Sequence, residues 1–225
     1  MKNAINSIAK RAISTGASGL ILLAFLTLGG CALPDKPVRP AVYDFGPGAL
    51  SVAPTKRTAP LAPLALAEIE AHPALDSNAV LYRLAYADAQ QLRPYALARW
   101  SMTPAQLVRQ RLRERLGQHR ALLNIGESGM AGGLAPLALR IELEEFSQLF
   151  ESPDKSAGLL RLRATLVQPG PTGDTLVAQR SVIVQRPAPS ADAPGGVRAM
   201  TAAADAAVQE LEQWLLQSTP PGKAP

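Results

Sequence analysis

The sequence is poor in the residues from which metal centres and redox sites are built. Its 225 residues include one cysteine and two histidines. A single cysteine excludes an intrachain disulfide, a thiol redox pair and a cysteine-rich zinc site, and two histidines leave little for a histidine-built metal centre. Because 47% of the residues are hydrophobic, the chain can bury a core without such cross-links. The one cysteine therefore needs another explanation.

The N-terminal apolar run is too short to span a membrane. Leu20–Leu28 is a run of about nine residues, whereas a spanning helix needs roughly 20 apolar residues. It follows three basic residues, Lys2, Lys10 and Arg11, and no acidic one. This order is typical of a secretory signal peptide, which we predict over residues 1–30.

The signal ends in Leu28-Gly29-Gly30-Cys31, which resembles the bacterial lipobox. The resemblance implies cleavage between Gly30 and Cys31, a diacylglycerol on the Cys31 thiol and an N-acyl chain such as palmitate on the new amine. Two or three acyl chains, at about 0.8 kcal/mol per buried CH₂, hold a protein on a membrane essentially permanently. Ala32 rather than aspartate favours the outer membrane. No cofactor other than this covalent lipid is expected; the alternative is an unmodified Cys31 after an uncleaved helix.

Cleavage would change the charge of the chain. The formal net charge is +5, and removing three bases with residues 1–30 leaves 20 bases, 18 acids and a charge of +2. The basic character is therefore weak evidence for nucleic-acid binding. Export excludes nucleic acid as a partner.

The remaining chain is predicted to contain one folded domain. Residues 31–40 are expected to form a lipidated, proline-stiffened tether, residues 41–217 the domain and residues 218–225 a disordered tail. Alternation of apolar residues predicts strands, and 3.6-residue periodicity predicts helices. The strands are expected at 41–45, 80–87, 95–100, 121–125, 137–146, 160–166 and 175–185, and the helices at 104–116, with Thr103 as its N-cap, and 197–215.

Two prolines and one change of phase refine this prediction. Pro63 places the mixed stretch 61–69 at a sheet edge or a bulge, and Arg93-Pro94 is expected to break the chain before the strand at 95–100. The alternation over 137–143 slips at Glu144–Glu145, which predicts a bulge there. We expect an α/β fold: a single domain with a curved, mostly antiparallel (mixed) sheet and two amphipathic helices packed on it.

No recognised catalytic pattern is present. His72 and His119 have no serine, cysteine or carboxylate at the spacing of a nucleophilic triad, and the glycine-rich segment 126–133 matches no phosphate-binding loop. We expect no enzyme and no metal site. The acids Glu142, Glu144 and Glu145 are better explained as an exposed row that pairs across strands with Arg161 and Arg163 than as acid–base catalysts.

Two sets of residues are candidates for binding. Arg109 and Arg113 share one face of the first predicted helix, and they either belong to an ordinary soluble surface or contact anionic lipid headgroups or an acidic partner. The four aromatic residues from 82 to 100 either pack two strands together in the core or form a half-exposed patch for a protein or for acyl chains. These residues are Tyr82, Tyr86, Tyr95 and Trp100.

A series of landmarks occurs along the chain in a distinctive order: Cys31, Tyr43, Tyr82-Arg83-Leu84-x-Tyr86, Tyr95-x-x-x-Arg99-Trp100, Thr103-Pro104, Leu143-x-x-Phe146-x-Gln148-x-Phe150 and Trp214-Leu215. Over residues 31–216 their order and spacing resemble a known family, the ABC-type transport auxiliary lipoproteins of the PqiC/YmbA-like group. Residues 46–60 and 187–196 depart from the family pattern, because they are longer and richer in Pro and Ala.

The resemblance implies a non-enzymatic outer-membrane lipoprotein that faces the periplasm. It would be the accessory or docking component for the MCE protein of an inner-membrane ABC transporter, which moves lipids or other hydrophobic molecules between the two membranes. Phospholipid and further copies of the chain (a homo-oligomer) stay open as additional partners. The main alternative is a structural or assembly lipoprotein of another envelope machine, for secretion or lipopolysaccharide insertion, and an envelope hydrolase is the least favoured.

Overall fold

The computed structural model describes residues 38–48, 61–124 and 135–218. The chain divides into two compact units, Met1–Val38 and Arg39–Pro225, and the second unit contains every helix and strand named below. The predicted signal peptide, Cys31, the glycine-rich segment 126–133 and nearly all of the predicted C-terminal tail lie outside the described residues.

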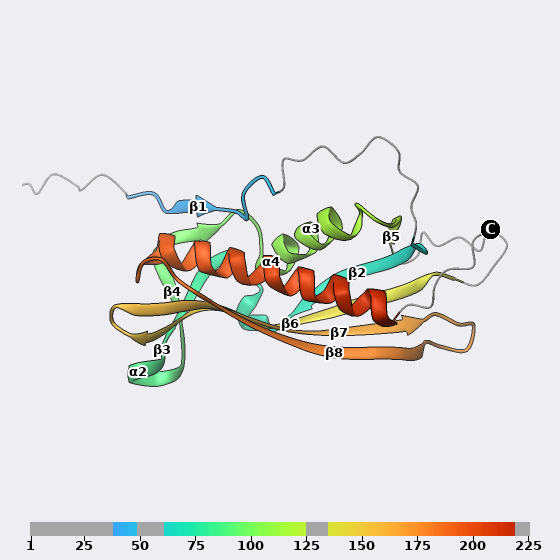
Figure 1. Ribbon diagram of the computed structural model, residues 1–225. Helices are drawn as coiled ribbons and strands as arrows, with labels where there is room; N and C mark the ends of the chain where they lie inside the picture. The colour runs from blue at the N-terminus through green and yellow to red at the C-terminus, as the bar shows by residue number, and fades with distance from the viewer. Residues whose placement is uncertain (1–37, 49–60, 125–134, 219–225) are drawn as a thin grey trace, which may run out of the picture. The chain divides into compact units, whose positions relative to one another are not determined.

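The fold is mixed α/β, with eight strands in one open sheet over the described residues (Figure 1). In the same described ranges, two long helices and one short helix accompany the sheet, together with a 3-10 turn, η1. The strands are β1 (Ala41–Tyr43), β2 (Leu64–Ala71), β3 (Ala79–Leu84), β4 (Ala89–Trp100), β5 (Leu122–Asn124), β6 (Leu137–Ser152), β7 (Lys155–Gln168) and β8 (Thr175–Pro187), and the helical elements are η1 (Pro73–Leu75), α2 (Ala85–Asp88), α3 (Pro104–Leu116) and α4 (Ala193–Ser218).

Strand β6 is the central strand of the sheet. Along one edge it pairs antiparallel with β7, which in turn pairs antiparallel with β8. The other edge of β6 is shared by two parallel strands, because β2 pairs with Leu137–Leu143 and β3 with Gln148–Phe150. Strand β4 then pairs antiparallel with β3, and the short strands β1 and β5 extend the sheet in parallel beside β4 and β2.

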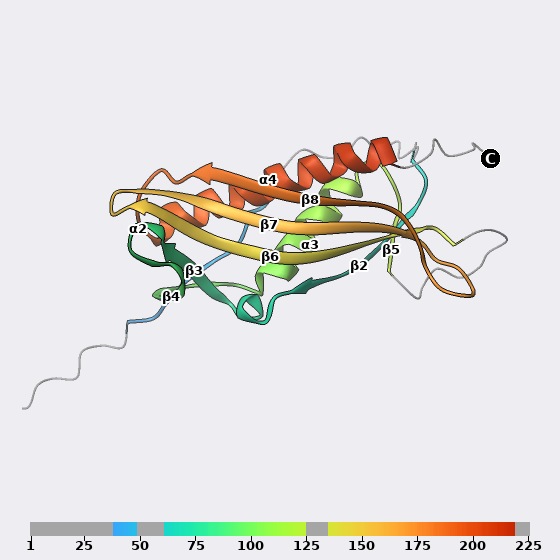
Figure 2. The ribbon, with the colours of Figure 1, turned by 90° about the horizontal axis from the view of Figure 1, so that it is seen from below.

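The predicted bulge and charge pairs are confirmed. The β6–β7 register shifts between Leu143 and Glu145, which puts Phe146 back on the buried face. On the opposite face, Arg161 Nε lies 3.4 Å from Glu144 Oε2. Arg163 Nη2 lies 2.9 Å from the other oxygen of Glu144. Figure 2 shows this face of β6, β7 and β8 in front of α3 and α4.

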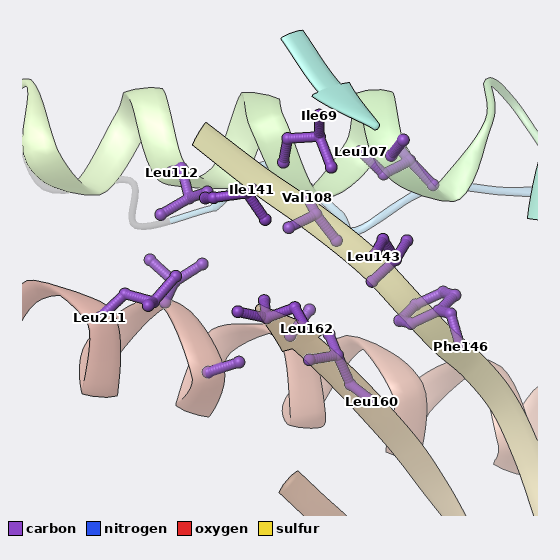
Figure 3. Packing of buried hydrophobic residues seen from close by; sticks show 14 of the residues in the cluster. Ile69, Leu107, Val108, Leu112, Ile141, Leu143, Phe146, Leu160, Leu162 and Leu211 are labelled. Carbon is purple, nitrogen blue, oxygen red and sulfur yellow. The ribbon is translucent and has the colours of Figure 1, made fainter. Parts of the chain in front are cut away.

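Both long helices pack on the other face of the sheet and enclose the core (Figure 3). Helix α3 begins with the predicted Thr103-Pro104 signal: the Thr103 hydroxyl accepts from Gln106 N and the Gln106 side chain accepts from Thr103 N, which is a capping box. Helix α4 approaches β7 closely at Gly158, where a Cβ would lie 2.3 Å from Met200 N. The core residues drawn and labelled in Figure 3 are Ile69, Leu107, Val108, Leu112, Ile141, Leu143, Phe146, Leu160, Leu162 and Leu211.

Three boundaries predicted from the sequence are wrong. The strand predicted over 80–87 ends at Leu84, because the chain turns into the short helix α2. Pro94 does not break β4, which runs through it. Helix α4 begins at Ala193, four residues earlier than predicted, because the Asp192 carboxylate accepts a hydrogen bond from Gly195 N at 2.7 Å and caps the first turn.

Candidate functional site

The predicted basic pair on α3 is tied to neighbouring strands. Arg109 Nη2 lies 2.9 Å from Glu68 Oε1, and Arg109 Nε donates to the Ala67 carbonyl at 3.2 Å. Arg113 Nη1 donates to Asn124 Oδ1 at 3.1 Å, and Arg109 reaches the same oxygen at 3.4 Å. The structure therefore brings Arg109 and Arg113 together, as the helical spacing predicted, and uses Arg109 to attach α3 to β2.

The next arginine along the helix joins α3 to α4. Arg111 Nε lies 3.1 Å from Asp205 Oδ1, and Arg111 Nη1 lies 3.4 Å from Glu114 Oε2. The same guanidinium donates to the Phe45 carbonyl and lies 5.9 Å from the centre of the Phe45 ring. Burial raises the pKa of Asp205, and the positive charge of Arg111 opposes that rise.

A cavity of about 570 Å³ lies in the groove between the two helices and the segment after β1. Its apolar lining includes Phe45, Ala206 and Val208, and its polar lining includes Arg111 and Asp205. Because those two charges already pair with each other, the groove has little uncompensated charge with which to hold an ionic ligand. Its chemistry suits a contact of mixed polarity.

Helix α3 is followed by a buried arginine that no sequence pattern predicted in the interior. Arg120 is 4% exposed, and its Nη1 has no hydrogen-bond partner among the described residues. Burial lowers the pKa of Arg120, against the effect of the nearby Glu212 carboxylate. The same carboxylate accepts from Arg115 Nε at 2.8 Å, so it links the ends of α3 and α4.

The four candidate aromatic residues do not form one patch. Tyr82 and Tyr95 pack with their ring centres 4.6 Å apart. Trp100 is 1% exposed and packs against Phe45 and Phe146 in the core, as the core-packing alternative expected. Tyr86 lies on α2 and is 48% exposed. The alternative prediction, that the four residues form one half-exposed patch, is therefore wrong, because the chain turns at Leu84 and separates Tyr86 from the others.

A polar network beneath the start of α4 fixes Tyr95. The Tyr95 hydroxyl donates to Gln148 Oε1 at 2.8 Å, and Gln148 Nε2 donates to Ser156 Oγ at 2.7 Å. Gln148 is fully buried. Burial first, then the charges of Tyr82 and Asp192, raises the pKa of Tyr95 well above its ordinary value. Each of these polar atoms has a partner, so the network acts as a structural support rather than as a reactive site.

One acid of the predicted exposed row is buried instead. Glu145 is 6% exposed, and its two carboxylate oxygens accept from Arg83 Nε and Nη2 at 3.2 and 3.0 Å. The Ser147 hydroxyl also donates to it, at 2.7 Å. The register shift between Leu143 and Glu145 sets Glu145 opposite Arg161, and Arg83 of β3 covers its carboxylate. The burial of Glu145 therefore depends on a strand far away in the sequence, and no local pattern could have revealed it.

The two histidines lie apart and serve local contacts. His72 Nδ1 accepts from Ala74 N at 3.3 Å, and His119 Nε2 lies 3.9 Å from Glu212. Over residues 38–48, 61–124 and 135–218, no group of three or more metal-ligating side chains is placed to hold an ion. In the same part of the chain, no helix has both the length and the apolar character needed to cross a bilayer.

The fold and these contacts define a two-layer α/β domain in which paired charges fasten the two helices to each other and to the sheet. The model of the family described as "ABC-type transport auxiliary lipoprotein component" matches residues 43–212. The chain belongs to this family, as the order of its landmarks predicted. The family is a transport accessory lipoprotein family and is not a known family of enzymes.

Solved structures confirm the fold. A crystal structure of a protein from Xanthomonas campestris, assigned to the family model DUF330, superposes with a TM-score of 0.62 at 18% identity, covering 79% of this chain and 96% of that one. A second crystal structure, of an uncharacterised protein, gives a TM-score of 0.55 at 14% identity and covers 80% of this chain and 99% of that one. No curated protein matches the sequence.

Proposed function

We propose that the chain is a lipid-anchored accessory component of an ABC-type transport system that moves lipid or another hydrophobic solute across the cell envelope. Diacylglycerol and an N-acyl chain on Cys31 would hold it on the periplasmic side of the outer membrane. The domain would then dock the MCE protein of the inner-membrane transporter. The observation that carries this proposal is the family match over residues 43–212, which begins twelve residues after the lipobox-like Cys31.

The structure supports a binding role through its groove. The α3–α4 groove is concave, is lined by both apolar and polar side chains and holds paired charges. Such a lining resembles the mixed composition of interfaces between separately folded proteins. Direct binding of phospholipid and assembly with further copies of the chain are not needed for this role.

The first experiment tests the anchor. Mass spectrometry of the N-terminal peptide from the membrane fraction is expected to show Cys31 as the first residue, carrying diacylglycerol and an N-acyl chain. Separation of the inner and outer membranes on a density gradient is expected to place the protein with the outer membrane. The Cys31→Ser variant is expected to keep its signal peptide and to lack the lipid.

The second experiment tests the partner. A photo-cross-linking residue at Gln209, in the lining of the groove, is expected to capture the MCE protein in cells. The matched control is Gln179, which is exposed on β8. Capture of the MCE protein from position 179 alone would support the MCE protein as the partner and would place the contact outside the groove. Capture of secretion or lipopolysaccharide-insertion components from either position would favour the assembly alternative and count against the transport proposal.

A further inference from the structure

Where β4 pairs with β1, the two faces of β4 differ in burial. Ala98 and Trp100 of β4 are each 1% exposed and belong to the core. Between and beside them, Leu97 is 52% exposed, and Val42 of β1 is 66% exposed. Val42 lies directly opposite Arg99 in the parallel register. Because alternate residues of a strand share a face, Leu97, Arg99 and Val42 lie together on the open side.

The charge on this face differs from that on the helices. Among the described residues, Arg99 takes part in no ion pair, and its Nη1 donates only to the carbonyls of Tyr95 and Ala98. Arg39, two residues before β1, is exposed and also has no ion pair within the described part of the chain. Asp44 follows β1, but one of its carboxylate oxygens accepts from Gly46 N at 2.7 Å. The face therefore combines aliphatic side chains with two arginines whose charges are not neutralised.

That combination matches the boundary layer of a phospholipid bilayer. Aliphatic side chains gain free energy by leaving water at the depth where acyl chains begin. Guanidinium groups form strong, often bidentate hydrogen bonds with phosphate oxygens and stay at the headgroup level on long apolar stems. A peptide partner would instead be expected to pair with the outer edge of β1, which has no neighbouring strand among the described residues and is only three residues long.

The length of the tether identifies which bilayer this would be. Arg39 is the eighth residue after Cys31, and an extended chain spans at most about 3.3–3.6 Å per residue. Arg39 would therefore lie within about 30 Å of an acylated Cys31. Strand β1, which begins at Ala41, is the first element of the domain after the tether and is thus held next to the membrane that receives the lipid.

We propose that the open face of β1 and β4, formed by Val42, Leu97 and Arg99 together with Arg39, rests on the phospholipid headgroups of the bilayer that anchors Cys31. This inference depends on the anchor in the proposed function. The contact fixes which way the domain faces, because it places one edge of the sheet against the membrane. It gives the lipid anchor a second, weaker point of attachment in the folded domain.

The experiment uses the acylated full chain in vesicles of phosphatidylethanolamine and phosphatidylglycerol. Cys31 is the only cysteine, and acylation blocks its thiol, so a cysteine introduced by Leu97→Cys can be labelled selectively with a polarity-sensitive fluorophore. The matched control is Ile183→Cys on β8, which is 65% exposed and paired with Arg161 on the polar outer face of the sheet. Brominated lipids then report which probe touches the bilayer.

We expect quenching at position 97 to exceed that at position 183 by roughly threefold or more, because the probe at 97 would sit about 5–10 Å into the interface. Arg39→Gln combined with Arg99→Gln, or vesicles without phosphatidylglycerol, should lower the quenching at 97 and leave that at 183 unchanged. Mass spectrometry of the same sample determines whether Cys31 is acylated.

Each contrary result has a defined meaning. An acylated chain whose two probes are quenched equally, or not at all, overturns this inference and leaves the proposed function intact. An unacylated Cys31 in the membrane fraction overturns both. The fluorophore at position 97 could instead report a less polar environment as the protein concentration rises, without being quenched by brominated lipid. That result would identify an interface between two copies of the chain and would also overturn the inference.

Discussion

Substitution of Gly158 by alanine tests how closely α4 must approach the sheet. A Cβ at this position would lie 2.3 Å from Met200 N and 2.4 Å from the carbonyl carbon of Ala199. Normal contact between such atoms begins near 3.5 Å, so the helix would have to move away by roughly 1 Å. Both atoms belong to the backbone, so no change of side-chain rotamer can relieve the clash.

The magnitude depends on the packing that such a movement would disturb. Ala203, Ala204 and Ala207 of α4 are fully buried, and a gap of 0.5–1 Å already loses about a quarter to a half of a packing contact. Overpacking of a core costs about 1–3 kcal/mol and sometimes more. The smaller entropy of the unfolded chain returns about 0.4–1 kcal/mol for a Gly→Ala change. Because both clashing atoms are backbone atoms, the cost is expected at the top of the overpacking range, and the net loss for Gly158→Ala is then about 2–2.5 kcal/mol.

Thermal unfolding followed by circular dichroism measures this loss. For a domain of this size, 1 kcal/mol corresponds to about 2–4 °C in Tm, so Gly158→Ala is expected to melt about 5–10 °C below the unaltered protein. Ser181→Ala, on the exposed outer face of β8, is the control and should stay within about 0.5 kcal/mol. A Gly158→Ala protein with an unchanged Tm would show that α4 does not lie as close to β7 as the structure places it.

Three further substitutions test the polar contacts. Arg83→Met leaves the Glu145 carboxylate without its cation and should cost about 2–3 kcal/mol, somewhat below the 3–5 kcal/mol of fully buried pairs. Adding Glu145→Gln should restore most of that stability, and failure to do so would contradict the pairing. Tyr95→Phe removes the hydrogen bond to Gln148 and should cost about 1–2 kcal/mol in urea unfolding at pH 7. Folding raises the pKa of the Tyr95 hydroxyl, so the bound proton stabilises the folded state below pH about 10, and this contribution is lost as the pH rises above that value. The free energy of unfolding of the unaltered protein should therefore fall more steeply at high pH than that of Tyr95→Phe. Parallel curves of stability against pH for the two proteins would refute this.

Local patterns predicted the parts of the fold that depend on short stretches of chain. The bulge near Glu145 is encoded by a change of phase that two neighbouring acids make visible. The beginning of α3 is encoded by Thr103-Pro104, because a hydroxyl cap and a proline in the first turn both suit the start of a helix. The pairing of Glu144 with Arg161 and Arg163 is expected once the two strands form a hairpin.

Tertiary context determined the features that local patterns could not predict. Pro94 is tolerated inside β4 because β1 pairs with β4 only from Ala98 to Trp100. Among the residues that the structure describes, one side of β4 therefore has no paired strand at Pro94, and a missing N–H there costs little. No local pattern shows that β2 and β3 share one edge of β6, since both pairings are parallel and join residues far apart in the sequence. The burial of Glu145 depends on that arrangement, because β3 supplies Arg83.

Two kinds of arginine that looked alike in the sequence differ in their partners. Arg109 and Arg111 already have carboxylate partners, so an anionic surface would have to displace contacts that each contribute up to about 1 kcal/mol where they are exposed. Within the described part of the chain, Arg99 donates only to carbonyls of its own strand, so it can turn toward a phosphate without breaking an ion pair there. Raised ionic strength should therefore weaken the lipid contact of the β1–β4 face before it loosens the attachment of α3. The candidate lipid contact thus moves from the helix, where the sequence pattern suggested it, to the strand nearest the tether.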